Sequence, residues 1–310
     1  YKRQALKDNQ SGSYNTILGA ETMSSNTTGS YNVAVGFRSL LLNLTGGYNT
    51  ALGYQSMYNN LADANTAIGY SSMYGNTSGV NNTGLGYWSL WANQTGSNNT
   101  AVGKFALQGV TNNSFSNNTA VGYNAGKAIT TGTQNIAMGV AALTAITTGS
   151  DNTALGFDSL KTVTTGSQNV VIGSGADVSA NNASNQVVIG YGATGVANNS
   201  VTLGNTSNES VFISSTVSTK PLVELKNTTN DANSGILKLV KDKGAAGADG
   251  DDIGILEFIG DDGAQTQTSF AKIVAEVSEA DDTDEAGKLS LFVAESDGTT
   301  TALTAGLVLE

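Results

Sequence analysis

The feature that most constrains this chain is a five-residue phrase that recurs through its first two thirds. Each copy has an Asn, a β-branched or apolar residue, a small residue, a large aliphatic residue and a Gly. The ten clear copies open at Asn15, Asn32, Asn49, Asn65, Asn82, Asn99, Asn118, Asn135, Asn152 and Asn169, and close at Gly19, Gly36, Gly53, Gly69, Gly86, Gly103, Gly122, Gly139, Gly156 and Gly173. Two degenerate copies follow at residues 186–190 and 200–204. Most Gly-to-Gly steps are 17 residues long, which is typical of a solenoid whose turns cannot bury their apolar faces alone.

Composition excludes several other classes of protein. Hydrophobic residues make up 39% of the chain and charged residues 13%, which is the opposite of a disordered composition. The chain has no Cys and no His, so the usual thiolate and imidazole metal ligands and the usual general base are absent. No apolar run approaches the roughly 20 residues of a membrane helix. We therefore expect no metal, no cofactor and no membrane insertion.

Charge divides the chain into two parts. Residues 1–205 hold 7 Lys and Arg and 6 Asp and Glu, whereas residues 206–310 hold 7 and 19. We expect a repeat array over residues 1–205, a neck over 206–220 and an acidic β-meander domain over 221–310. Because neither part has a basic stripe to neutralise phosphates, nucleic acid is not an expected partner.

Within a repeat, the phrase predicts a short strand, because side chains alternate between the two faces. Thr50 and Leu52 then lie on one face and Ala51 on the other. A small residue and a large apolar residue follow each Gly, as at Ser56 and Met57, and predict a second short strand before a polar loop. The recurring Asn is either a turn former or one member of a stacked amide ladder, and the ladder is favoured.

A coil of 17 residues encloses little space, which favours association of several chains. We expect the larger residues to fill each coil and the small face, which includes Ala101, to let neighbouring chains approach closely. Three chains around one axis would cover both faces, so the sequence predicts an obligate homotrimer. On this interpretation, Ala101→Phe separates the chains and lowers thermal stability.

Phrases such as Asn99-Thr100-Ala101-Val102-Gly103 resemble the head repeats of trimeric autotransporter adhesins, and the 17-residue version is similar to arrays in phage tail-fibre proteins. The resemblance covers about residues 12–205. It implies a left-handed parallel β-roll in a trimer. The fold class is thus all-β: a trimeric parallel β-solenoid followed by a small antiparallel β domain.

The second part changes to patterns of half-buried antiparallel strands. We expect strands over residues 222–226, 235–241, 253–259, 269–277, 288–294 and 305–309. Segments 221–227 and 240–260 are similar to a domain near the distal end of marine phage tail fibres, where a self-cleaving chaperone domain often follows.

Neither catalytic nor metal-binding residues are expected. The carboxylates of the array are scattered over different turns, whereas glycan cleavage needs a pair in one cleft. The sequons at Asn26, Asn43, Asn76 and Asn93 are by-products of the repeat and need no glycan.

Aromatic residues follow many of the glycines and are expected to line up in stacked turns: Phe37, Tyr54, Tyr70, Tyr87, Tyr123, Phe157 and Tyr191, with Trp88 and Trp91 nearby. They serve either as packing between turns or chains, which is favoured, or as a receptor contact through Tyr54, Tyr70, Tyr87, Trp88 and Trp91.

The expected function is that of a homotrimeric virion tail fibre, extracellular and without catalysis, with a structural and host-attachment role. Its partners would be itself, other tail components, and a glycan or protein of the host surface. The alternative is the head of a bacterial trimeric adhesin on the cell surface that binds host surface or matrix.

Overall fold

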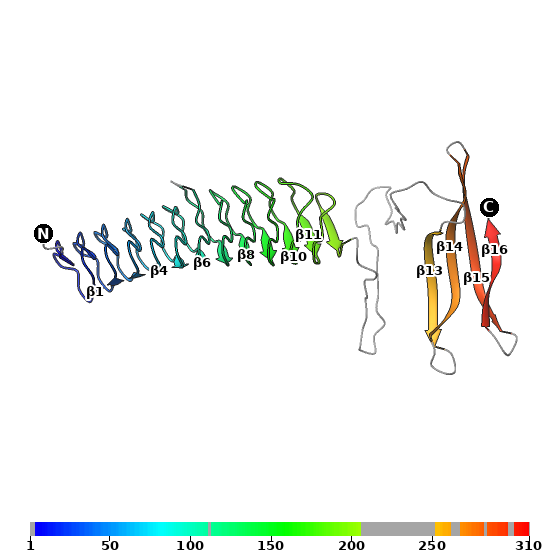
Figure 1. Ribbon diagram of the computed structural model, residues 1–310, viewed down its shortest axis with the longest axis horizontal. Helices are drawn as coiled ribbons and strands as arrows, with labels where there is room; N and C mark the ends of the chain where they lie inside the picture. The colour runs from blue at the N-terminus through cyan, green and yellow to red at the C-terminus, as the bar shows by residue number, and fades with distance from the viewer. Residues whose placement is uncertain are drawn as a thin grey trace, which may run out of the picture. The chain divides into compact units, whose positions relative to one another are not determined.

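The computed structural model describes residues 4–110, 113–205, 252–261, 267–281, 284–296 and 301–309. The chain divides into two compact units, Tyr1–Phe212 and Ile213–Glu310. The described residues are all-β, with no helix (Figure 1). The predicted neck at 206–220 and the predicted strands at 222–226 and 235–241 lie outside them.

The first unit is a parallel β-solenoid, as the repeat predicted. Each phrase forms one short strand, and each strand pairs in parallel with the strands of the turns before and after it. The strands are β1 (Thr16–Leu18), β2 (Val33–Val35), β3 (Thr50–Leu52), β4 (Thr66–Ile68), β5 (Thr83–Leu85), β6 (Thr100–Val102), β7 (Thr119–Val121), β8 (Ile136–Met138), β9 (Thr153–Leu155), β10 (Val170–Ile172), β11 (Gln186–Ile189) and β12 (Ser200–Leu203). At about 4.8 Å per step, the eleven steps of this sheet span roughly 53 Å.

The strand faces point the opposite way from the prediction. Ala51, Ala101 and their counterparts are fully buried inside the coil, while the Thr and aliphatic residues on either side face outward. The large residue of the following segment explains this, because Leu40, Met57, Leu90 and their equivalents already occupy the narrow interior. The strand residue opposite these three is Ala34, Ala51 and Gly84, respectively.

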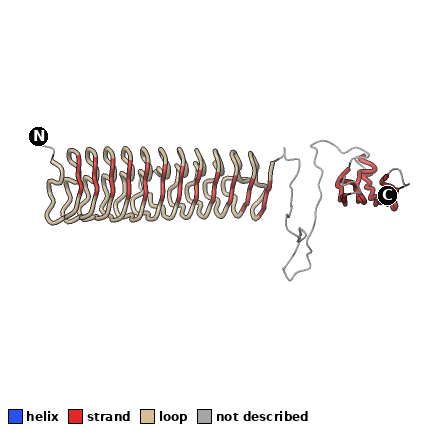
Figure 2. The backbone as a smooth tube through the Cα atoms, turned by 90° about the horizontal axis from the view of Figure 1, so that it is seen from below, coloured by secondary structure: helices blue, strands red, loops and turns tan. Residues whose placement is uncertain are grey.

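The predicted second strand is also wrong. After each Gly the backbone forms consecutive turns, and Figure 2 shows one strand per turn with loop elsewhere. Alternate residues there have positive φ, as at Gln55 (52°) and Met57 (51°), so the segment is too compact to be a strand. It still bonds from turn to turn, since the Met57 N–H donates to the Ser72 carbonyl at 2.9 Å.

The Asn side chains form the predicted ladder. In a typical step, the Asn118 N–H donates to Asn99 Oδ1 at 3.0 Å, and Asn118 Oδ1 accepts from the Asn135 N–H at 2.9 Å. Asn118 Nδ2 also donates to the carbonyl of Gly132 in the next turn, at 3.0 Å. Equivalent links join every step from Asn15 to Asn169 and continue to Gln186.

The glycine that closes each phrase lies where the chain leaves the strand. All ten have φ between 125° and 141°, a region that side chains rarely adopt. At Gly86, a Cβ atom would also lie 2.5 Å from the carbonyl oxygen of Gly103 in the next turn. Both the conformation and the close stacking of turns therefore require glycine.

The second unit contains an antiparallel meander of four described strands, in the order β13 (Asp252–Asp261), β14 (Gln267–Asp281), β15 (Asp284–Ser296) and β16 (Thr301–Leu309). These strands coincide with the last four that the sequence predicted. Neighbouring strands pair antiparallel, with a register shift in each pair.

A Phe in place of Ala101 should overfill the interior of the solenoid itself. We expect Ala101→Phe to lower the free energy of unfolding by about 1–3 kcal/mol or more, because the surrounding turns are fixed by their own hydrogen bonds. Lys104→Phe places the same ring on an exposed position of the same turn and should change the melting temperature little. Equal melting temperatures for the two variants would contradict the inward position of Ala101.

Removing one amide from the ladder should destabilise the stack. Asn118→Leu keeps a similar volume but leaves the Asn135 N–H and the Gly132 carbonyl without partners, at a cost of about 1–3 kcal/mol each. Chemical denaturation should show that loss, while the exposed loop substitution Asn182→Leu should stay within about 0.5 kcal/mol of the wild type. If the ladder does not contribute to stability, Asn118→Leu and Asn182→Leu should have the same denaturation midpoint.

Candidate functional site

The aromatic residues of the post-glycine segments form one connected surface on the solenoid. Tyr54 stacks on Tyr70 with ring centroids 4.9 Å apart, and Tyr70 stacks on Tyr87 at 5.1 Å. Phe37 extends this column at one end, so the predicted ladder is present from Phe37 to Tyr87. Such stacked pairs add stability beyond the area they bury.

The two tryptophans join this column to a second one. Trp88 stacks on Tyr87 at 5.2 Å and on Trp91 at 5.4 Å. Trp91 in turn stacks on Tyr74 at 6.2 Å, and Tyr74 on Tyr58 at 5.0 Å. All five residues predicted as receptor contacts therefore lie in one continuous set of rings.

Phe105 and Tyr123 complete the set, through contacts of Phe105 with Tyr87, Trp88 and Tyr123. We call this surface the aromatic patch: Phe37, Tyr54, Tyr58, Tyr70, Tyr74, Tyr87, Trp88, Trp91, Phe105 and Tyr123. Phe157 and Tyr191 are exposed but are not neighbours of these rings, since Val140 and Ser174 occupy the adjacent positions of the repeat.

Two aromatic columns were missed by the sequence analysis. One is Tyr58–Tyr74–Trp91. The other is Tyr14–Tyr31–Tyr48, in which each Tyr directly precedes the Asn of its repeat and neighbouring ring centroids are 5.0 Å apart. The signal was available, because each column repeats an aromatic residue at one position of consecutive repeats.

Cationic side chains lie at the margins of the aromatic patch. Two lysines lie over the Phe105 ring: Lys104 Nζ is 4.9 Å from its centroid, and Lys127 Nζ is 5.1 Å from the same centroid. At the other end, the Arg38 guanidinium lies 4.9 Å from the Phe37 ring and bonds to Glu21 at 2.6 Å. The hydrogen bond to Glu21 raises the pKa of Arg38, which therefore stays charged.

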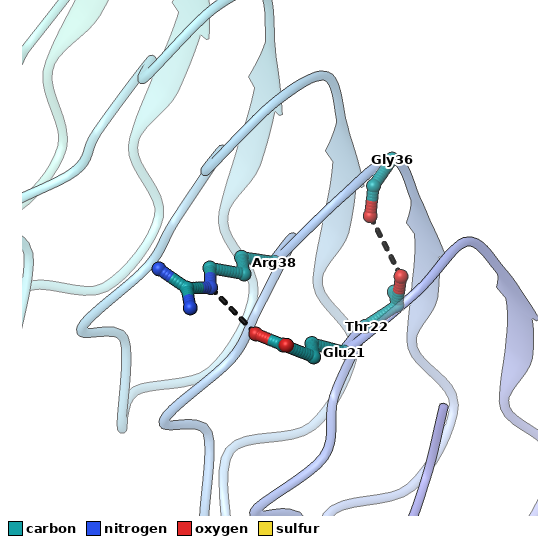
Figure 3. A network of polar contacts seen from close by, with 4 residues as sticks. All are labelled: Glu21, Thr22, Gly36 and Arg38. Carbon is teal, nitrogen blue, oxygen red and sulfur yellow. Dashed lines mark hydrogen bonds and ion pairs between the residues drawn. The ribbon is translucent and has the colours of Figure 1, made fainter. Parts of the chain in front are cut away.

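Figure 3 shows how this end of the patch is tied to the preceding turn. The Arg38–Glu21 pair crosses between two turns, and beside it the Thr22 hydroxyl donates to the Gly36 carbonyl at 2.6 Å. These contacts join the turn that contains Glu21 and Thr22 to the turn that contains Gly36 and Arg38, and their role is structural.

The interior of the patch contains a donor without a partner. Trp88 Nε1 is buried and makes no hydrogen bond. An unpaired buried N–H costs about 1–3 kcal/mol.

A second distinct surface lies on the outer face of the long sheet. One aliphatic residue per strand points outward there, and together they form what we call the aliphatic stripe: Leu18, Val35, Leu52, Ile68, Leu85, Val102, Val121, Met138, Leu155, Ile172, Ile189 and Leu203. All twelve strands contribute, and none of these side chains is buried in the chain. Large exposed apolar patches are often interaction sites, so the aliphatic stripe is a candidate contact surface.

Most carboxylates of the array have a local structural partner. Asp63 accepts from the Gly47 N–H at 2.7 Å, Asp158 pairs with Lys161 at 3.2 Å, and Asp177 accepts from the N–H groups of Thr162 and Val178. Burial raises the pKa of the Asp177 carboxyl. Across the described part of the chain, no group of three or more acidic, His or Cys residues is placed to hold a metal ion.

The sequon asparagines are inside the coil. Asn26, Asn43, Asn76 and Asn93 are buried, and each donates to the carbonyl of the Gly three residues later. A glycan on these amides would be incompatible with the folded turn, in agreement with their interpretation as products of the repeat.

The fold and its two surfaces define a β-solenoid repeat protein with one aliphatic and one aromatic exposed face. Comparison of the chain with protein-family models, curated proteins and solved structures gave no significant match. Within the parts of the chain that the structure describes, no helix has the length and apolar character needed to cross a membrane.

Proposed function

We propose that this chain forms a homotrimeric fibre with a structural and host-attachment role in a virion tail, and that it has no catalytic activity. The observation that carries the proposal is the aliphatic stripe, which continues through all twelve strands. A monomer would leave this row in water along roughly 53 Å of solenoid.

The stripe also suggests which face meets the other copies. The Ala face is unavailable, because it is buried inside each coil. Three narrow sheets turned toward a common axis would cover the stripe of every chain. Closed symmetric assemblies of this kind are the common form of oligomer, and the resemblance to trimeric fibres favours three copies.

Two neighbouring residues provide a matched test of the assembly. Met138 and Val140 are both 42% exposed, but Met138 belongs to the aliphatic stripe and Val140 to the post-glycine segment. We expect Met138→Asp to weaken or abolish the trimer, because it buries an unpaired charge at the contact. Val140→Asp should leave it intact.

Native mass measurement reads the result directly, since the wild type should have three times the 31.6 kDa mass of one chain. A wild type that stays monomeric at micromolar concentration would contradict the trimer. If Met138→Asp and Val140→Asp dissociate the trimer to the same extent, the aliphatic stripe is not its contact surface.

The role as a fibre follows from mechanical properties. Every turn is bonded to its neighbours by a strand, by the post-glycine segment and by the Asn ladder, so the solenoid is a stiff spacer. A stiff trimeric spacer with an exposed aromatic surface suits attachment at a distance from a particle.

Location in the virion can be tested by electron microscopy. Antibodies raised against the purified chain should label the tails of phage particles grown on the host. Labelling of the surface of uninfected bacterial cells instead would refute the virion assignment.

A further inference from the structure

A pocket of about 190 Å³ opens within the aromatic patch. The residues that line it include Asn59, Tyr74, Thr77, Trp91 and Gln94. Two of them are stacked aromatic rings from consecutive turns, and the other three carry amide or hydroxyl groups. The pocket therefore combines two aromatic side chains with polar groups of no net charge.

The polar groups are held in position by bonds between turns. Asn59 Nδ2 donates to the Tyr74 carbonyl at 3.1 Å, and the Thr77 hydroxyl donates to the Gln94 carbonyl at 3.1 Å. Each bond uses only part of the hydrogen-bonding capacity of its side chain, since an amide has two donors and an acceptor oxygen, and a hydroxyl also accepts. Oriented donors and acceptors thus remain beside the rings.

The pocket lining contains no acidic or basic side chain. Tyr74 is its one titratable residue, and burial raises the pKa of that hydroxyl, so the lining is neutral at physiological pH. An anionic or cationic ligand would find no counter-charge there. The chemistry favours an uncharged ligand rich in hydroxyl groups.

Size narrows the ligand further. Pockets for drug-sized molecules measure about 300–1,000 Å³, so this pocket accommodates one small ring. A hexose in its chair form has C–H groups, which make apolar contacts with aromatic side chains, and hydroxyl groups at its rim, which bond to amides.

The positions that form the pocket are not required by the fold. The column that holds Trp91 has Leu41, Tyr58, Tyr74, Gln108 and Lys127 in nearby turns, so the solenoid accepts many residue types there. The aliphatic stripe, by contrast, keeps one residue class in all twelve strands. The clustering of rings around Trp91 is thus a local feature, as a binding site would be.

We propose that this pocket binds one uncharged hexose or N-acetylhexosamine unit of a surface polysaccharide, which packs against the side chains of Trp91 and Tyr74 and bonds to Asn59 and Thr77. Flanking units would lie along the rest of the aromatic patch. The inference rests on the proposed attachment role and names its ligand class.

The chain carries its own reporter for this site. Trp88 and Trp91 are its only tryptophans, so all indole fluorescence comes from the aromatic patch. We would titrate the full chain with glucose, galactose, mannose, N-acetylglucosamine and glucuronate, and with oligomers of the uncharged sugars. At least one uncharged sugar should give a saturable change in emission, at millimolar concentration for a single ring and lower for an oligomer.

Substitutions identify the binding residue. Trp91→Ala keeps Trp88 as reporter and should weaken binding about tenfold or more, and Trp91→Phe should fall between that variant and the wild type. Tyr191→Ala removes an aromatic ring that is 78% exposed outside the patch and should bind as the wild type does. If Trp91→Ala fails to fold, as its melting curve would show, Trp91→Phe still tests the contribution of the aromatic side chain at residue 91 to binding.

Three results would overturn the proposal: no saturable response to any sugar, a response to glucuronate alone, or equal affinity of Trp91→Ala and wild type. Loss of host-cell attachment after protease treatment of the cells, without any sugar response, would assign the patch to a protein partner. Native mass measured on the same samples shows whether the trimer is present, so a failure of sugar binding can be distinguished from a failure of trimer assembly.

Discussion

The buried Asn amide at the start of each strand is the interaction on which the solenoid depends. Its backbone carbonyl joins the strand ladder, as when the Thr50 N–H bonds to the Asn65 carbonyl, but its own N–H finds no backbone acceptor. The residue before it has positive φ in every turn, for example 61° at Tyr48, and this turns the N–H toward the side chain of the preceding Asn. A buried backbone donor must be satisfied, and the amide column does so once per turn.

This requirement shapes the rest of the coil. The amide column and the glycine at the end of each strand set a tight turn, so in most turns the interior holds a small strand residue and a Leu or Met from the opposite segment. Residues such as Leu52 then have no place inside. The aliphatic stripe is therefore a consequence of a core that is already full, and the proposed trimer would cover it.

The sequence predicted the parts of the structure in which a repeated residue type has a specific structural requirement. The period, the strands, the glycines and the Asn ladder all follow from side chains that only one arrangement satisfies. It did not reveal which strand face is buried, because alternation separates two faces without saying which is inside. The general tendency of larger side chains to be buried gave the wrong answer, since Met57 and its equivalents fill the interior instead.

Backbone conformation explains the other error. Gln55, Met57, Trp88 and Leu90 all have φ near 50°, which residues without special turn chemistry rarely adopt. Local propensity cannot predict such a segment, because bonds to the turns above and below impose it. The aromatic column from Phe37 to Tyr87 was foreseen from its spacing, but the pocket beside Trp91 was not. It depends on how the compact post-glycine segment brings Tyr74 and Trp91 onto one face.

The two exposed surfaces differ in a way that bears on what each does. A contact that runs along a fibre axis meets the partner chain at every step, so each turn must present the same kind of residue there. The aliphatic stripe meets that condition in all twelve strands. A surface that recognises a ligand has no such constraint and needs its residues only where the ligand lies. The aromatic patch, confined between Phe37 and Tyr123 and bounded by Arg38, Lys104 and Lys127, has that local character. This difference between a local and a repeated surface agrees with the two proposed roles, recognition for the aromatic patch and assembly for the aliphatic stripe.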